Sequence, residues 1–467
     1  MPITLSRVVS ISSALSLTAL LGGSYTYADP PADKSDVATF PDTAAGAALR
    51  WWLDAFNSGD AAQIEAYCAE YRPGEPCAAR MIPLSQRTGG FEQLSIRQSQ
   101  PHHIEFLVTE KTSGGRLRGT LDMGAGDNAK VTGIMLTPIP KDAVLDDVTL
   151  DSAARGKIIE GAVAQLNENY VDVNMAKKMA AAVRARQKHG DYDAALMGDR
   201  FAEIVTADFR AVSHDKHLRL SFSPARVLVD QTFPSAAELE QNRKDLERNN
   251  CFFERVEVLP GNIGYLKFNA FAEQQFCAPT AIAAMNFLGN VDALIVDLRD
   301  NGGGSPAMVT LVSSYLFAEP THLNDLWTRK GEITRQYWTL PYVPGKRLAD
   351  KPVFVLTSTH TFSGAEEFSY NLKTLKRATI VGETTGGGAH PVAPHSIDEH
   401  FTIFVPFAKA INPTTKTNWE GVGVEPDVKV PAADALATAQ KLAGERFSRG
   451  ARVVRSGVGR DPSRRSH

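Results

Sequence analysis

The strongest constraint on the fold is an alternation of short apolar runs and helix-like segments that begins at Cys251. The strand-like runs are NIGYLKFN, VDALIVDLRDN, PVFVLTS, RATIVGET and FTIFVPFAKA, and segments such as APTAIAAMNFLG and SPAMVTLVSSYLF between them have helical periodicity. Strands that alternate with helices predict an α/β sheet with crossover connections. Active sites of such sheets lie at the carboxyl ends of the strands.

The rest of the chain divides into segments of different pattern. We expect an α+β domain of two helices and an antiparallel meander over residues 45–145, and a helical subdomain over residues 150–248. The α/β domain then covers residues 249–435. Residues 29–44 are predicted to be a linker, and the basic tail 436–467 is predicted to be disordered.

The first 28 residues have the pattern of a secretory signal peptide. Arg7 precedes an uncharged apolar run, and the small residue Ala28 is placed for cleavage. This predicts an exported protein, periplasmic or extracellular after cleavage. No later run approaches the ~20 apolar residues of a membrane span, so no integral membrane segment is expected.

The four cysteines of an exported chain indicate disulfides. Three pairings are open, and the local one, Cys68 with Cys77 and Cys251 with Cys277, is favoured; free buried cysteines are the alternative. No pair has the tight spacing of a zinc site. The net charge of −3 gives no basic footprint, so no nucleic-acid partner is expected.

Two loops with chemical potential follow strands of the α/β domain. In DLRDNGGGSP, Gly303 and Gly304 free the backbone for close approach to a ligand, as an oxyanion site requires. A flexible turn is the simpler alternative, and the ending of a phosphate loop is missing.

The second loop, THTFSGAEE, sets Ser363 directly before a helix. Ser363 and Glu366 form a capping-box pattern, so the serine could be a helix cap or a nucleophile. The N–H of Gly364 at the helix start could stabilise negative charge.

Five motifs occur in the order and spacing of the tail-specific (C-terminal processing) peptidase superfamily: GYLKFNAF, DALIVDLRDNGGG, VFVLTSTHTFSGAEEF, ATIVGETTGGGAHP and NWEGVGVEPDV. The chain most resembles its tricorn-like and interphotoreceptor retinoid-binding-protein-like branch, over about residues 150 to 435. The resemblance implies a ClpP/crotonase-like α/β fold, Ser363 as nucleophile, and oxyanion N–H groups from Gly364 and the Gly303 region.

The 45–145 domain resembles the nuclear transport factor/SnoaL-like superfamily, on the segments WLDAFNSGDAAQIEAY and GIMLTPIP. Domains of that superfamily bind ligands, catalyse reactions or dimerise. No clustered acid–base pair is evident in this part of the sequence, so we expect an accessory role.

The resemblance also bears on the catalytic base. The lysine of the C-terminal processing enzymes has no counterpart in TTGGGAHP, whereas the tricorn-like branch uses a histidine, which His217 in SHDKHLRL matches. His214 is the fallback. Glu420 in NWEGVGVEPD matches the glutamate that orients the histidine, although an exposed loop acid is the alternative. A histidine base near its usual pKa predicts activity that rises between about pH 6 and 8.

Neither a metal nor a cofactor is expected. His214 and His217 are three residues apart and would face opposite sides of a strand. His390, His395 and His400 follow no standard ligand spacing and are predicted to be loop histidines, with His390 at the cleft.

Together these patterns predict an exported serine peptidase that acts on peptides or proteins. The alternative is a non-catalytic carrier of a hydrophobic ligand or peptide on the same fold. Homo-oligomerisation stays open.

Overall fold

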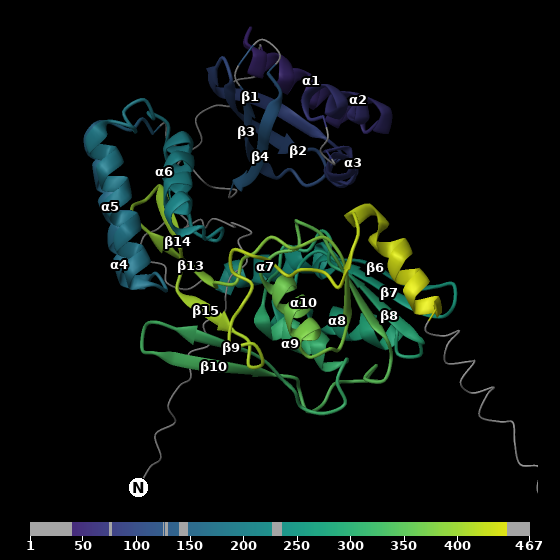
Figure 1. Cartoon of the computed structure of the whole chain (residues 1–467). Coiled ribbons are helices and arrows are strands. Elements are labelled where there is room, and N and C mark those ends of the chain that lie inside the picture. Colours follow the sequence, from purple (N-terminus) through teal and green to yellow (C-terminus); the bar gives the residue numbers. More distant parts are fainter. Residues whose placement is uncertain are drawn as a thin grey trace, which may run out of the picture. The chain divides into compact units, whose positions relative to one another are not determined.

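The computed structural model describes residues 40–73, 77–124, 126, 129–139, 148–226 and 236–445. These residues form two compact units, one with the elements up to residue 139 and one with the elements from residue 148 onward (Figure 1). The predicted signal peptide, most of the predicted linker and the tail beyond residue 445 lie outside the described residues.

The first unit contains three helices followed by a four-stranded antiparallel sheet in the order β1-β2-β3-β4. Its elements are α1 (Ala44–Ser58), α2 (Ala61–Tyr71), α3 (Cys77–Thr88), β1 (Phe91–Gln100), β2 (His103–Glu110), β3 (Arg116–Met123) and β4 (Val131–Ile139). A disulfide between Cys68 and Cys77 joins α2 to α3. The unit has the expected α+β composition, with α3 and β1 in addition to the predicted elements.

The second unit begins with three helices, α4 (Ser152–Asn169), α5 (Val173–His189) and α6 (Gly198–Ser213). The strand that follows, β5 (Arg219–Phe222), pairs with β14 (Phe401–Pro406), which in turn pairs with β13 (Val392–Ser396). Buried residues of the helices share one core with Leu220 and Ile403. The predicted helical subdomain therefore includes strands from the far end of the chain.

The main sheet has the strand order β16-β12-β11-β8-β7-β6, and its pairs are parallel except for β6 with β7. Its elements are α7 (Ala236–Arg248), η1 (Asn250–Phe252), β6 (Phe253–Leu259), β7 (Ile263–Phe268), α8 (Gln274–Phe287), β8 (Ala293–Asp297), α9 (Pro306–Ser314), β11 (Val353–Thr357), α10 (Gly364–Thr374), β12 (Thr379–Gly382), β16 (Val428–Lys429) and η2 (Ala432–Asp434). A second disulfide joins Cys251 to Cys277, so both of the favoured local cysteine pairings are present.

Alternate residues of the central strands belong to two different cores. Because neighbouring side chains of a strand point to opposite faces, the sheet is covered on both sides. A helix over residues 435–445 contributes to the second core, in which Ala435, Ala439 and Ala443 are fully buried. Residues 436–445 are thus ordered and helical, contrary to the prediction of a disordered tail from residue 436.

A smaller sheet in the order β10-β9-β15 completes the unit, with β9 (His322–Thr328), β10 (Ile333–Trp338) and β15 (Ala408–Ile411). The segment FTIFVPFAKA, predicted as one strand, is two: β14 pairs with β5 and β15 pairs with β9. In the described part of the chain, no helix has the length and apolarity needed to cross a membrane.

Candidate active site

The turn between β11 and α10 holds Ser363 in an unusual backbone conformation. Its φ of 53° and ψ of −119° differ from the extended conformation of an ordinary N-cap, and a positive φ strains a residue with a Cβ. The preceding residues fix the turn, because Thr361 Oγ1 donates to the Leu298 carbonyl at 2.8 Å and the Phe362 N–H donates to the Asn301 carbonyl at 3.0 Å. Ser363 therefore stands at a sharp bend tied to the segment that follows β8.

Glu366 ties this bend to the loop after β12. Its Oε2 accepts the N–H groups of Ser363 and Gly388, both at 2.8 Å, and its Oε1 accepts the N–H of Gly387 at 2.6 Å and the hydroxyl of Thr385. Burial raises the pKa of this carboxyl group, and the four donors oppose that rise. The predicted capping box of Ser363 and Glu366 is present, but the same carboxylate also holds a second loop.

The glycine loop after β8 packs directly on Ser363. A Cβ added at Gly303 would lie 2.5 Å from Gly364 N and 2.7 Å from Ser363 Cβ, so only glycine allows this approach. The Gly303 N–H donates to Asn301 Oδ1 at 2.8 Å. Of the three predicted oxyanion donors, Gly303 is thus engaged elsewhere, while the N–H groups of Gly304 and Gly364 have no hydrogen-bond partner among the described residues.

His217 lines the same cavity of about 210 Å³ as Ser363, Gly304 and Gly364. Its ring packs on the ring of Phe362, with centroids 4.6 Å apart. His214, the fallback base, is instead the exposed C-cap of α6, with a φ of 59°.

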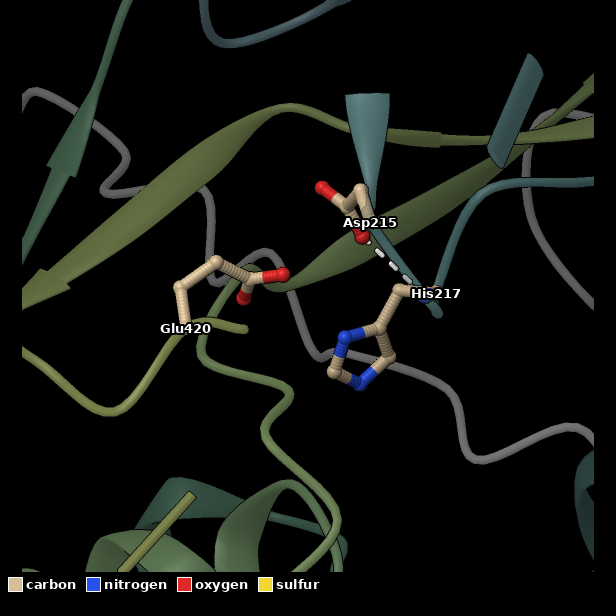
Figure 2. Close-up of side chains that lie close together, drawn as sticks. All are labelled: Asp215, His217 and Glu420. Atoms are coloured by element: carbon tan, nitrogen blue, oxygen red, sulfur yellow. Dashed lines mark hydrogen bonds between the residues drawn. The ribbon is translucent and has the colours of Figure 1, made fainter. Parts of the chain in front are cut away.

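Two carboxyl groups lie beside His217 (Figure 2). Side-chain atoms of Asp215, His217 and Glu420 lie within 4.8 Å of one another, and a ring nitrogen of His217 is turned toward Glu420. His217 Nδ1 and Glu420 Oε1 are buried, and neither has a hydrogen-bond partner within the described residues. Glu420 Oε2 accepts the N–H of Ala389 at 2.5 Å.

Asp215 is a member of the site that sequence reasoning did not assign. It accepts the backbone N–H of His217 at 3.0 Å, the ring N–H of His390 at 2.7 Å and the hydroxyl of Tyr170 at 3.2 Å. Its place two residues before His217 was the available signal. Because its oxygens are already engaged by these three donors, Asp215 is a poor ligand for a metal ion at this cluster. His390, predicted at the cleft, is not among the described residues that line the cavity and instead pairs with Asp215.

The charges of the cluster follow from burial and from these pairs. Burial lowers the pKa of His217 to about 4, against the opposing effect of Asp215. Burial, together with the negative charge of Asp215, raises the pKa of Glu420 to about 7. Burial alone would lower the pKa of His390, but its bond to Asp215 raises it. The site therefore combines a neutral imidazole at pH 7 with a carboxyl group poised to ionise.

Comparisons with known proteins agree with the motifs. Residues 262–430 match the model of Peptidase family S41, and residues 148–260 match the N-terminal domain of Peptidase_S41 in eukaryotic interphotoreceptor retinoid-binding protein (IRBP). The chain is 28% identical over 190 residues to the carboxyl-terminal-processing peptidase 2, chloroplastic, of Arabidopsis thaliana. That match covers 38% of this chain and only 35% of the length of the relative.

Solved structures give more distant similarities. The photosystem II D1 C-terminal processing protease is 16% identical with a TM-score of 0.38, over 60% of this chain and 94% of that one. The tricorn protease is 13% identical with a TM-score of 0.37, over 74% of this chain and 40% of that one. Neither similarity says anything about activity. The chain therefore contains a peptidase family S41 domain over residues 262–430, preceded by an S41 N-terminal domain over residues 148–260.

Proposed function

We propose that the protein is an exported serine peptidase in which Ser363 is the nucleophile, His217 the general base and Glu420 the group that orients His217. The observation that carries the proposal is the cavity that Ser363 and His217 share, with the N–H groups of Gly304 and Gly364 beside the strained serine turn. A nucleophile, a base and oxyanion donors are the parts that acyl transfer requires.

In the proposed reaction, Ser363 Oγ attacks the carbonyl carbon of a peptide bond and its proton passes to His217 Nε2. The oxyanion accepts hydrogen bonds from the Gly304 and Gly364 N–H groups. As the C–N bond breaks, His217 returns the proton to the leaving amine. Water then attacks the acyl-enzyme, gives its proton to His217, and releases the acid as Ser363 regains a proton.

The environment of His217 fits this role. Its lowered pKa keeps the imidazole neutral and able to accept a proton at pH 7. For Nε2 to accept the serine proton, the neutral imidazole must carry its own proton on Nδ1, which lies on the side of Glu420, whose Oε1 has no partner in the described residues. An ionised Glu420 would stabilise the positive charge of the imidazolium that forms.

A lysine base is disfavoured by the packing of the loop after β12. A Cβ added at Gly388 would lie 2.6 Å from His217 Cε1 and 2.3 Å from Phe362 Cζ, so the two rings occupy the space of a side chain there. Lys373, the next lysine after Ser363, pairs with Asp427 at 3.2 Å.

Export is supported by the predicted signal peptide and by the two disulfides, since disulfides persist in oxidising compartments. Mass spectrometry of protein recovered from the periplasm or the medium should find an N-terminus near Asp29. An intact Met1 in the cytoplasmic fraction would contradict export.

A fluorophosphonate probe and a peptide-library digest test the catalytic proposal together. The probe should label Ser363, and Ser363→Ala should lose labelling and lower peptide cleavage on the order of a thousandfold or more. Thr359→Ala, in the same loop but exposed, is the matched control and should keep both. Absence of labelling, with cleavage equal in Ser363→Ala and parent, would overturn the proposal and favour a carrier.

A further inference from the structure

A second buried glutamate, Glu367, lies one turn into α10 and faces the cavity. It is four residues after Ser363 and donates its N–H to the Ser363 carbonyl at 2.9 Å, so both side chains lie on one face of the helix. Glu367 lines the same cavity as Ser363 and His217. Its Oε1 is buried and has no hydrogen-bond partner in the described part of the chain.

Asn324 of β9 lies beside Glu367 and is equally unsatisfied. Its side chain is fully buried, and neither its amide nitrogen nor its amide oxygen has a hydrogen-bond partner among the residues described. The Asn324 amide offsets part of the effect of burial on the Glu367 carboxyl group without forming a hydrogen bond of ordinary geometry. Tyr337, paired with Asn324 on β10, is also near Glu367.

Such groups are costly to bury. A carboxyl oxygen and an amide without partners lose their hydrogen bonds to water and gain none from the protein. No lysine or arginine of the described ranges forms an ion pair with Glu367. The cation that lines the cavity, Arg219, lies over the Phe404 ring at 3.7 Å from its centroid.

Several other side chains that line the cavity are apolar. Leu326, Ala410 and Trp419 line it together with Glu367. A cavity lined by apolar side chains and a buried acid matches a side chain that has an aliphatic stem and a cationic tip.

Resting on the proposed peptidase activity, we propose that this cavity binds the side chain of the substrate residue whose carbonyl Ser363 attacks. Glu367, with Asn324 beside it, selects lysine or arginine at that position. The tip of the basic side chain donates to Glu367 Oε1 and to the Asn324 amide oxygen.

The selectivity follows from what other side chains would leave behind. An apolar side chain of similar length fills the cavity but leaves Glu367 without a partner, and a site with unpaired polar groups rejects such an analogue strongly. An acidic side chain brings a second carboxyl group next to Glu367, which is unfavourable. We therefore expect basic residues to be preferred over methionine by roughly tenfold or more in kcat/KM, and glutamate to be the poorest.

Fluorogenic peptides that differ only in the residue before the cleaved bond test this directly. Lysine, methionine and glutamate peptides are compared, and mass spectrometry identifies the bond that is cut. Glu367→Gln should lower the lysine-to-methionine ratio of kcat/KM by about tenfold or more. Glu319→Gln, which removes the same charge from an exposed position, should leave the ratio unchanged.

The outcomes separate this inference from the activity on which it rests. If Ser363→Ala abolishes cleavage but Glu367→Gln leaves the ratio unchanged, or the parent prefers methionine, the selectivity is overturned and the peptidase stands. If nothing is cleaved, anisotropy with fluorescein-labelled peptides compares Ser363→Ala with the Ser363→Ala/Glu367→Gln double variant. Tighter binding of the lysine peptide that depends on Glu367 supports the pocket, and equal affinities overturn it.

Discussion

Two adjacent buried glutamates in the first turn of α10, Glu366 and Glu367, differ in their hydrogen-bond partners. On the loop side, the Glu366 carboxylate accepts four hydrogen bonds from the serine turn and the loop after β12. On the cavity side, Glu367 Oε1 accepts none within the described residues, although both side chains are almost fully buried. Residue type and burial are the same, so the partners alone distinguish a carboxylate that holds the site together from one that can receive a substrate.

The largest expected effect comes from removing the proposed catalytic base, His217, which lies beside the loops that Glu366 holds together. Gly388, which Glu366 fixes, packs against the His217 ring, whereas His214 is exposed at the end of α6. We expect His217→Ala to lower kcat on the order of a thousandfold or more, because removal of a catalytic base disables the serine. His214→Ala should retain most of the activity.

Steady-state hydrolysis of one peptide by both variants provides the measurement, with circular dichroism as a check on folding. A dead His214→Ala together with an active His217→Ala would reverse the assignment of the base. The loops that Glu366 holds together would then have no catalytic role.

The second prediction has a smaller expected effect and concerns the stability and activity of variants at Glu366 and Glu367. Glu366→Gln keeps the shape but turns an amide N–H₂ group toward N–H groups of Ser363, Gly387 or Gly388, so acceptors are lost. We expect a loss of about 2 kcal/mol or more in the free energy of unfolding, and a fall in kcat of roughly a hundredfold as the serine turn loosens. Glu367→Gln should instead leave stability unchanged or raise it at pH 8, since it removes a buried carboxylate whose Oε1 has no hydrogen-bond partner in the described residues.

Urea denaturation gives the stabilities, and the rate of fluorophosphonate labelling reports on the serine turn. A merely structural role for Glu366 would lower stability but leave the labelling rate of the folded fraction intact. Equal shifts in the two variants would show that the difference in partners has no energetic consequence.

The sequence predicted the elements better than their assembly. Periodicity located most helices and strands of the second unit, because each pattern reflects local burial. Periodicity could not predict that FTIFVPFAKA divides into β14, which pairs with β5, and β15, which pairs with β9. These pairings join residues far apart in the chain. The alanines at 435, 439 and 443 have the spacing of a buried helix face, a signal outweighed by the basic residues beyond them.

The site divides in the same way. Motifs pointed to Ser363, His217 and Glu420, but the Asp215–His390 pair joins residues 175 apart and carries no local pattern. The capping box predicted that Glu366 reaches Ser363, and only the fold reveals the other donors. The sequence analysis did not single out Glu367, because a missing hydrogen-bond partner cannot be predicted from sequence.

The smallest expected effect concerns Glu420, whose Oε1, like that of Glu367, is buried without a partner in the described chain. Burial, and secondly Asp215, raises its pKa to about 7, so Glu420 is neutral below that pH and ionised above it. Only the ionised form stabilises the His217 imidazolium, so kcat/KM should rise from pH 6 to pH 8 by about tenfold. The sequence predicted such a rise from the histidine itself, but His217, with a pKa of about 4, is already neutral across this range.

Glu420→Gln decides between the two origins of the rise. If Glu420 is responsible, the variant should show a flat profile between pH 6 and 8, near the level of the parent at pH 6. A rise that persists in Glu420→Gln would assign it to another group, and His390, whose pKa is raised by Asp215, is the nearest candidate. His390→Gln would then remove it. A flat profile in Glu420→Gln would leave separate roles for the two carboxyl groups whose Oε1 is buried without a partner in the described chain, Glu367 toward the substrate side chain and Glu420 toward the base.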